Sequence, residues 1–246
     1  MADFDLRTRL VLGDSGIEKL ENSRVAVFGL GGVGSFCAEA LARAGIGALD
    51  LIDNDVISLS NINRQLYALH STVGKAKIEV AAVRIADINP ACRVITHRVF
   101  YLPETAQMFD LKAYDYIVDA VDTVSAKLAL AENAYHAGTP VISCMGTGNK
   151  LDPCAFLAAD IFETDTDPLA RVMRKELKKR GVPALKVVYS PEKARRPDAA
   201  LLQPVMQAEL GEGSSRRDIP GSVSFVPSVA GLVMAGEVVK DLCGSV

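Results

Sequence analysis

The feature that most constrains the fold is an alternation of short apolar runs with helix-length segments. The apolar runs lie at residues 24–29, 49–53, 94–99, 116–119 and 141–144, and segments with helical periodicity lie between them at 35–44, 75–88 and 124–137. A strand that is apolar throughout is buried on both faces, as in a parallel sheet covered by helices. We therefore predict an α/β fold over residues 24–145, with a doubly wound, mostly parallel, Rossmann-like sheet.

The chain on either side of this core is expected to add a few elements. A short helix is predicted at 16–22, a further strand at 155–159, a basic helix at 168–180 and a closing helix at 229–242. Four prolines and three glycines between 190 and 221 predict a long, mobile loop. We expect a single domain over 6–246, with a nucleotide-binding core at 24–145 and a C-terminal, substrate-side extension of helix, loop and closing helix at 146–246.

Composition excludes several classes of protein. Hydrophobic residues make up 49% of the chain, which rules out a disordered polypeptide. The N-terminus lacks the apolar core of a signal peptide, and the most lipid-like stretch, 223–239, contains Pro227 and Glu237 and is shorter than the ~20 residues of a membrane span. Five widely spaced cysteines form no C-x-x-C pair, which argues against a disulfide framework or a zinc site. We expect a cytoplasmic protein with no membrane partner.

A glycine-rich loop follows the first apolar run and precedes the first helix. Its sequence is Gly-Leu-Gly-Gly-Val-Gly, and its glycines are Gly29, Gly31, Gly32 and Gly34. Glycines here allow backbone N–H groups to approach phosphate oxygens, and the helix N-terminus favours negative charge. Asp53, at the end of the second run, is placed to accept hydrogen bonds from a ribose. The pattern predicts nucleotide binding, and the alternative is a glycine-rich turn that serves packing alone.

Charged residues after this loop distinguish two kinds of nucleotide enzyme. Arg64 and Lys77 supply positive charge for a leaving pyrophosphate, and Asp122, after the fourth strand, supplies a carboxylate that can hold Mg²⁺. A nicotinamide oxidoreductase, which the glycine pattern alone also allows, needs none of them. Singly these residues have simpler explanations as solvated charges, a helix cap or, for Asp55 and Asn61, turn formers.

Taken together, these residues closely resemble the ubiquitin-activating-type (ThiF-like) adenylating superfamily. The resemblance implies that the glycine loop and the Asp-x-Asp pair bind ATP, with the first aspartate on the ribose. It also implies that an Asn, an Arg-Gln pair and a Lys contact the phosphates, and that an Asp binds Mg²⁺. Beside the four glycines, the matching positions are Asp53, Asp55, Asn61, Arg64, Gln65, Lys77 and Asp122. Homodimers of this family insert an N-terminal Arg into the partner's site, for which Arg9 is the candidate and Arg7 the fallback.

Further motifs indicate the branch of the superfamily. The segments 45–47, 88–94, 151–153, 167–170 and 221–226 resemble the tRNA threonylcarbamoyladenosine dehydratases, over roughly residues 6–180 and 220–242. The resemblance implies ATP-dependent dehydration of this modified adenosine in tRNA: the carboxylate is adenylated, and intramolecular cyclisation then releases AMP. It implies ATP and Mg²⁺ as cofactors and leaves open a monovalent cation and a sulfur-transfer partner.

The distribution of charge is an independent indication of a polyanionic partner. Residues 171–196 contain ten Lys or Arg against two Glu, a net +8 in a chain of net charge −3. One strongly basic face suits contact with the phosphates of tRNA. The simpler alternative is a solvated basic helix followed by a loop.

Two competing functions remain at this stage. One is adenylation of the C-terminal glycine of a ubiquitin-like sulfur-carrier protein, against which the missing zinc cysteine pairs and the basic segment count. The other is a non-catalytic nucleotide-binding or sulfur-relay protein, which would have no use for the pyrophosphate-contacting residues. Cys144 and Cys154 are expected near the rim of the site, and we interpret them as packing residues rather than nucleophiles.

Overall fold

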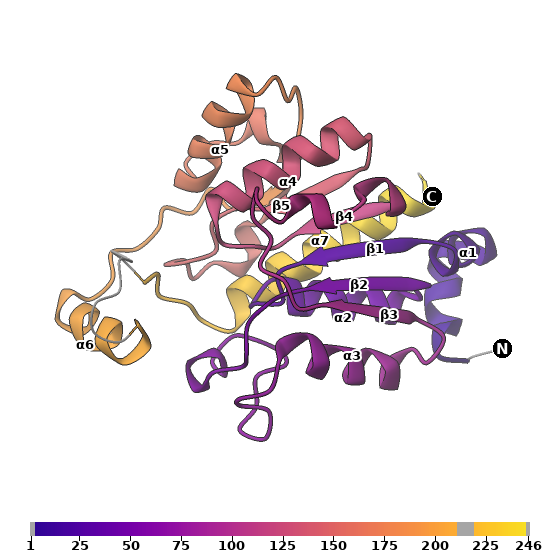
Figure 1. Cartoon of the computed structure of the whole chain (residues 1–246), viewed down its shortest axis with the longest axis horizontal. Helices are drawn as coiled ribbons and strands as arrows, with labels where there is room; N and C mark the ends of the chain where they lie inside the picture. The colour runs from indigo at the N-terminus through magenta and orange to yellow at the C-terminus, as the bar shows by residue number, and fades with distance from the viewer. Residues whose placement is uncertain (1–2, 211–218, 245–246) are drawn as a thin grey trace.

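The computed structural model describes residues 3–210 and 219–244 of the chain. They form a seven-stranded sheet in the order β3-β2-β1-β4-β5-β7-β6, with helices on both sides (Figure 1). All neighbouring strands pair in parallel except β6, which is antiparallel to β7. The strands are β1 Arg24–Phe28, β2 Ala48–Ile52, β3 Arg93–His97, β4 Tyr116–Asp119, β5 Val141–Cys144, β6 Leu157–Asp160 and β7 Lys186–Tyr189. The predicted doubly wound, mostly parallel α/β fold is confirmed.

Helices bury both faces of this sheet. They are α1 Leu6–Glu21, α2 Gly34–Ala44, α3 Lys77–Ile88, α4 Val124–Ala137, α5 Pro168–Lys179, α6 Ala199–Leu210 and α7 Phe225–Cys243. Alternate residues of β1 show the two-sided burial. Val25 and Val27 pack into the core shared with α2, α3 and α7, whereas Ala26 and Phe28 pack into the core shared with α4. Burial on both faces is the reason why the strands are apolar throughout.

The closing helix α7 lies directly against the start of α2. A Cβ atom on Gly231 would lie 2.3 Å from the carbonyl oxygen of Val33, so only glycine allows the two backbones to approach this closely. The helix begins at Phe225, four residues before the predicted start. Pro227 explains the difference, since proline is tolerated in the first turn of a helix, where its missing N–H is not needed. This packing brings the C-terminal part of the chain beside the glycine loop.

Other element boundaries differ from the predictions in instructive ways. Helix α1 is longer than expected because two helical stretches meet at Gly13, whose backbone is non-helical. Strand β7, a short run beside the edge strand β6, was not predicted. The strand expected at 155–159 is present as β6. Helices α2, α3, α4 and α5 lie within two residues of their predicted bounds.

The expectation of a loop throughout 190–221 is corrected by helix α6. Good helix-forming residues precede Pro204, which lies inside this helix, and the side chain of Asp198 accepts a hydrogen bond from the N–H of Ala200 at 2.9 Å. The prolines therefore do not exclude a helix here. Part of the expected mobile loop, 211–218, lies outside the described residues.

The strand order reverses between β1 and β4. The chain runs outward from β1 to β2 and β3 on one side, and from β4 to β5 on the other. In open α/β sheets such a switch point opens a crevice at the carboxyl ends of the strands, where ligands bind. These ends point to the left in Figure 1, toward the side on which α6 lies.

Candidate active site

The glycine loop lies at this crevice and uses its glycines in two different ways. Gly29 has a φ of +88°, and a Cβ atom there would lie 2.7 Å from the carbonyl oxygen of Ala120 at the end of β4. A Cβ atom on Gly34 would lie 1.8 Å from the carbonyl oxygen of Gly29. Both positions therefore require glycine for the fold itself. A Cβ atom on Gly31, in contrast, would meet nothing closer than the side-chain nitrogen of Gln65 at 3.9 Å, so this position stays open toward a ligand.

Three charged residues predicted to bind the nucleotide, Asp53, Asp55 and Lys77, lie close together beside this loop. One oxygen of Asp53 accepts a hydrogen bond from the N–H of Leu30 at 2.7 Å, and the other accepts one from the N–H of Asp55 at 2.8 Å. The ammonium of Lys77 lies 2.8 Å from a carboxylate oxygen of Asp55 and 4.0 Å from one of Asp53. Burial raises the pKa of Asp53 above its usual value, although Lys77 and the two N–H groups oppose the shift. Lys77 is itself buried, at the start of α3.

The segment 58–65 folds over the open side of the glycine loop. The side chain of Asn61 accepts a hydrogen bond from the N–H of Ser58, which fixes the turn. Arg64 is half-buried, and its guanidinium donates to the carbonyl of Ser60 at 3.0 Å and to the side chain of Asn63 at 2.9 Å. Gln65 reaches Gly31, as described above. The structure thus places Gln65 and the backbone of Arg64 beside the loop, whereas Asn61 and the guanidinium of Arg64 are hydrogen-bonded within the segment 58–65.

Asp122 is the residue predicted to hold Mg²⁺. It follows β4 and is exposed, and its carboxylate accepts a hydrogen bond from the hydroxyl of Thr123 at 3.3 Å. Because Ala120 contacts Gly29, the segment that carries Asp122 directly adjoins the glycine loop. Among the described residues no group of three or more His, Cys, Asp or Glu is arranged to hold a metal ion. A single carboxylate nevertheless suffices for Mg²⁺ when the phosphates of a nucleotide complete its coordination.

Arg9 is not near the crevice of its own chain. Its guanidinium forms ion pairs with Asp5 at 2.8 Å and Asp14 at 2.5 Å. It lines a cavity of about 320 Å³ together with Gly45 and Gly47, which precede β2, at the amino-terminal edge of the sheet. Arg7 is exposed. The structure of one chain therefore places Arg9 at the edge of the sheet opposite to the glycine loop.

Two buried lysines near the carboxyl ends of the strands were missed by the sequence analysis. The ammonium of Lys127 lies 3.1 Å from Asp119 and 3.2 Å from the hydroxyl of Ser143. The ammonium of Lys150 lies 2.8 Å from Asp167. A lysine within the apolar run of α4 was the available signal for Lys127, since a buried charge must be paired. Nothing comparable marks Lys150.

Cys144 shows no sign of nucleophilic activation. Burial raises the pKa of the Cys144 thiol to about 12, far from the value of a thiol that is ionised at neutral pH. Cys154 is exposed on the short turn before β6. The interpretation as a packing residue fits Cys144, which is buried, and is wrong for Cys154, whose side chain is exposed and therefore packs in no core.

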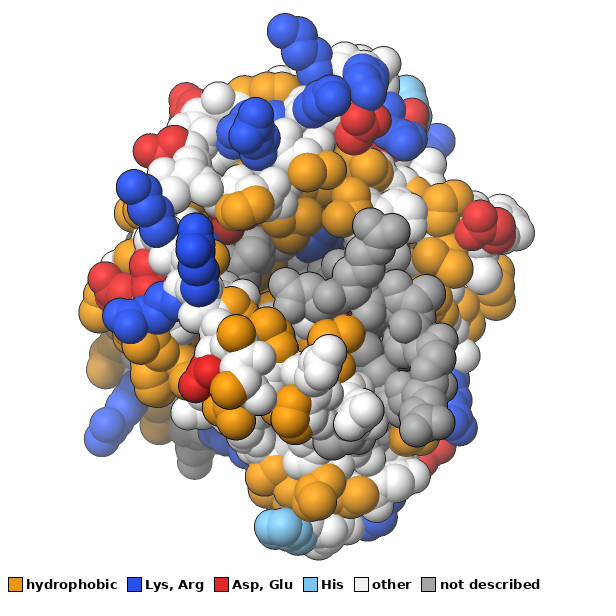
Figure 2. Space-filling model, turned by 90° about the vertical axis from the view of Figure 1, so that its left-hand side faces the viewer, with side chains coloured by type: hydrophobic (Ala, Val, Ile, Leu, Met, Phe, Trp, Pro, Cys, Tyr) orange, Lys and Arg blue, Asp and Glu red, His pale blue; other side chains and the backbone are white. Residues whose placement is uncertain are grey.

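The basic segment is only partly free for a partner. Arg174 donates to the backbone of Thr164, and Lys186 pairs with Glu237 and Asp241. The side chains of α5 and the following segment that remain exposed are Arg171, Lys175, Lys178, Lys179, Arg180, Lys193, Arg195 and Arg196. Figure 2 shows Lys and Arg side chains gathered at the top of the face that carries the strand ends, where α5 lies in Figure 1.

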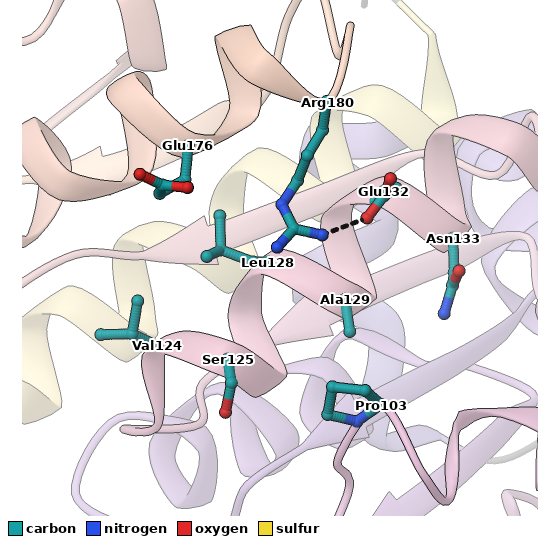
Figure 3. Close-up of a pocket in the computed structure, with 9 residues that line it drawn as sticks. All are labelled: Pro103, Val124, Ser125, Leu128, Ala129, Glu132, Asn133, Glu176 and Arg180. Atoms are coloured by element: carbon teal, nitrogen blue, oxygen red, sulfur yellow. Dashed lines mark hydrogen bonds and ion pairs between the residues drawn. The ribbon is translucent and has the colours of Figure 1, made fainter.

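A cavity of about 430 Å³ lies between α4 and α5, away from the glycine loop. Arg180 crosses it from the end of α5 and pairs with Glu132 on α4 at 2.6 Å (Figure 3). Its walls contain none of the residues predicted to bind the nucleotide. In the part of the chain that the structure describes, no helix has the length and apolar character needed to cross a membrane.

Comparison with known proteins gives consistent results along the chain. A model of the ThiF family matches residues 5–245. The tRNA threonylcarbamoyladenosine dehydratase of Bacillus subtilis (strain 168) is 45% identical over 241 residues, covering 96% of this chain and 93% of that protein. The Escherichia coli (strain K12) protein of the same name is 35% identical over 246 residues, covering 96% of this chain and 91% of its own length. The crystal structure of the E. coli tRNA N6-threonylcarbamoyladenosine dehydratase TcdA in complex with ATP has a TM-score of 0.85 at 32% identity, covering 98% of this chain and 96% of that one.

Proposed function

The chain belongs to the ThiF family, and from that premise we propose that it is an ATP-dependent tRNA threonylcarbamoyladenosine dehydratase. It activates the carboxylate of this modified adenosine by adenylation and closes the substituent to its cyclic form. The observation that carries the proposal is the convergence of four separate segments on one crevice: the glycine loop, the Asp53–Lys77 cluster, segment 58–65 and Asp122. Relatives that align over almost the whole chain bear the dehydratase name, which favours it over activation of a sulfur-carrier protein.

The residues in the crevice suit ATP. N–H groups of the glycine loop and the N-terminus of α2 attract phosphate oxygens, and Gly31 leaves room for them. Asp53 takes the ribose hydroxyls. Asn61, Arg64, Gln65 and Lys77 contact the phosphates, where Arg64 and Lys77 balance the charge of the leaving pyrophosphate.

Mg²⁺ fits one carboxylate in this arrangement. Asp122 is exposed and the segment that carries it adjoins the glycine loop, so its carboxylate is the group that would hold Mg²⁺ beside the phosphates of ATP. The ion supplies positive charge that makes pyrophosphate a better leaving group.

The proposed chemistry has two steps. In the first, an oxygen of the threonine carboxylate attacks the α-phosphorus of ATP, and the bond to the pyrophosphate breaks. In the second, the urea-type amide nitrogen of the same substituent attacks the activated carbonyl and loses its proton to water, a five-membered ring closes, and AMP leaves with the oxygen that was activated. Nucleophile and electrophile belong to one substituent, so proximity drives this step. No protein nucleophile is required, in agreement with the burial of Cys144.

The tRNA and a second copy of the chain are the proposed partners, and the cytoplasm is the proposed location. The exposed lysines and arginines of α5 support contact with RNA phosphates. Exposed apolar side chains around Arg9 support a homodimer: Leu10 is 87% and Val11 72% exposed, an arrangement that a second subunit would cover. In such a dimer Arg9 acts in the crevice of the other subunit.

The decisive experiment is mass spectrometry of the nucleosides of tRNA that carries threonylcarbamoyladenosine. After incubation with the pure protein, ATP and Mg²⁺, the modified nucleoside should lose the mass of one water molecule, and omission of ATP should prevent the loss. An unchanged nucleoside would contradict the proposal. If the same preparation then exchanged pyrophosphate into ATP only with a sulfur-carrier protein present, the alternative function would replace it.

A further inference from the structure

The loop between β5 and β6 holds a buried cation that the proposed chemistry does not use. The ammonium of Lys150 lies 2.8 Å from a carboxylate oxygen of Asp167, 2.8 Å from the carbonyl oxygen of Gly146 and 3.0 Å from that of Ser190. Its three N–H donors therefore have three acceptors. The side chains of Lys150 and Asp167 are 2% and 0% exposed. One ammonium thus joins the loop after β5, the start of α5 and the segment that follows β7.

Asn149, the residue next to Lys150, is hydrogen-bonded to both ends of the segment 195–221, which we call the 195–221 excursion. Asn149 has a φ of +59°, which only a few residue types tolerate. Its N–H donates to the carbonyl of Gly221 at 2.8 Å, and its side-chain oxygen accepts from the N–H of Gly221 at 2.7 Å. Its own carbonyl accepts from the N–H of Arg195 at 2.7 Å. A single residue therefore holds both Arg195, where the chain departs, and Gly221, where it returns.

The residues that Asn149 holds are connected by hydrogen bonds to the candidate active site. The residue after Gly221, Ser222, accepts a hydrogen bond through its carbonyl from the side chain of Asn63 at 3.0 Å, and Asn63 contacts Arg64. A little further on, Pro227 lies where a Cβ atom on Gly32 would be 3.1 Å away. On the other side, Asp167 accepts a hydrogen bond from Ala170 and so begins the basic helix α5. The Lys150 cluster thus lies between the phosphate-contacting segment and the basic face.

We propose that Lys150 is a positioning residue for the RNA substrate: its ammonium holds the start of α5 through Asp167 and fixes the loop that carries Asn149, and Asn149 in turn holds Arg195 and Gly221. The inference rests on the proposed function for the identity of that substrate. The residues proposed to bind ATP are held independently of Lys150, because Asp53 is hydrogen-bonded to the N–H groups of Leu30 and Asp55 and Lys77 is paired with Asp55. Loss of the ammonium should therefore affect RNA more than ATP.

The first test is the variant Lys150→Met, which keeps the length of the side chain and removes its charge. We expect the KM for tRNA and its dissociation constant to rise about tenfold or more, because displaced positioning groups lose productive contacts. The affinity for ATP should fall much less, because Asp53 and Lys77 are held separately. Trypsin should cleave after Arg195 faster than in the wild type, since the N–H of Arg195 loses its fixed acceptor; the bond after Arg196 is resistant in both proteins because Pro197 follows it.

The matched control is Arg24→Met. It removes another cation from a buried carboxylate, because Arg24 binds Asp50 with two hydrogen bonds of 2.8 and 2.9 Å, but it lies at the start of β1, away from the crevice. A comparable loss of thermal stability without a change in tRNA affinity is expected. If both variants weaken tRNA binding equally, Lys150 contributes only to general stability and the inference is wrong.

A second variant covers the case in which Lys150→Met does not fold. Lys150→Ala leaves space for a small alkylammonium ion, and added propylammonium should restore tRNA affinity and slow the cleavage by trypsin. No rescue in a folded Lys150→Ala variant would contradict the inference. These binding and proteolysis measurements need no turnover, so an inactive wild type would count against the proposed function while the role of Lys150 was still decided.

Discussion

At the scale of single residues, neighbouring glycines of one loop meet different demands. Gly34 leaves no room for a side chain, because a Cβ atom would lie 1.8 Å from the carbonyl oxygen of Gly29. Gly31 faces open space and has no packing reason to be glycine. A glycine motif in the sequence does not distinguish Gly34 from Gly31. Their separation into a folding requirement and a binding requirement comes only from the structure.

This separation predicts opposite behaviour for two alanine variants. Gly34→Ala should destabilise the fold by about 1–3 kcal/mol, since the loop must shift to avoid the clash. Gly31→Ala should leave the melting temperature nearly unchanged and weaken ATP binding, because the methyl group occupies the space of a phosphate. Thermal unfolding and ATP titration measure both effects. Unaltered ATP affinity in Gly31→Ala would place the phosphates elsewhere.

Asp122 is the residue on which the metal role depends. Asp122→Asn keeps the shape of the side chain and removes its charge, so turnover should fall about 10²-fold or more while tRNA affinity is kept. Steady-state kinetics over a range of Mg²⁺ concentrations and filter binding of tRNA are the measurements. Asp87→Asn, an exposed change on α3, is the control. Full turnover by Asp122→Asn would remove Asp122 from the mechanism.

At the scale of secondary-structure elements, α5 combines two faces with separate tasks. Ala170, Met173 and Leu177 are buried and anchor the helix. Lysines and arginines fill the outer face, and Lys178 and Lys179 lie in the last turn, where positive charge also suits the helix dipole. The outer face is therefore free to change without loss of the inner packing.

Charge reversal on this outer face should weaken tRNA binding. The triple variant Lys175→Glu, Lys178→Glu and Lys179→Glu removes up to three phosphate contacts, and each lost contact should lower the slope of log K against log salt by roughly 0.7–0.9. Filter binding at several salt concentrations measures this slope. Lys112→Glu, on the short turn before β4, should leave it unchanged. An unaltered slope in the triple variant would move the RNA interface to another surface.

Elements differ in how far the sequence predicts them. Parallel strands and their helices follow from local patterns, since burial on both faces makes β1 and β4 apolar throughout. Helix α6 was not predicted because it contains Pro204, and β7 was not predicted because it is only a short run of residues. Lys150 could not be found in this way. Its acceptors at Asp167 and Ser190 come from parts of the chain that only the fold brings together.

At the scale of the whole molecule, one chain does not bring Arg9 to its own crevice. Arg9 lies at the amino-terminal edge of the sheet, whereas the glycine loop lies at the carboxyl-terminal edge. The proposed dimer resolves this separation by pairing the edge of one subunit with the crevice of the other. The family resemblance predicts that Arg9 serves the partner's site, and its place in one chain is consistent with that prediction.

Mixing of two inactive variants tests this arrangement. Arg9→Ala lacks the inserted arginine, and Asp122→Asn lacks the carboxylate. A mixed dimer would contain one complete site, with Arg9 from one chain and Asp122 from the other, so random exchange of subunits should restore about a quarter of the wild-type activity. Each variant alone should stay inactive. If the mixture is also inactive although subunit exchange is demonstrated, Arg9 does not act across a dimer.

The hydrogen bonds of Asn149 to both ends of the 195–221 excursion should allow this segment to change in length. Because Arg195 and Gly221 are both hydrogen-bonded to one residue, the polypeptide between them begins and ends at nearly the same point. Doubling the length of such a segment costs only about 0.6 kcal/mol in closure entropy. Peptides inserted between Arg195 and Gly221 should therefore leave the sheet and the crevice intact, and an unchanged melting temperature and ATP affinity of such an insertion variant would check this.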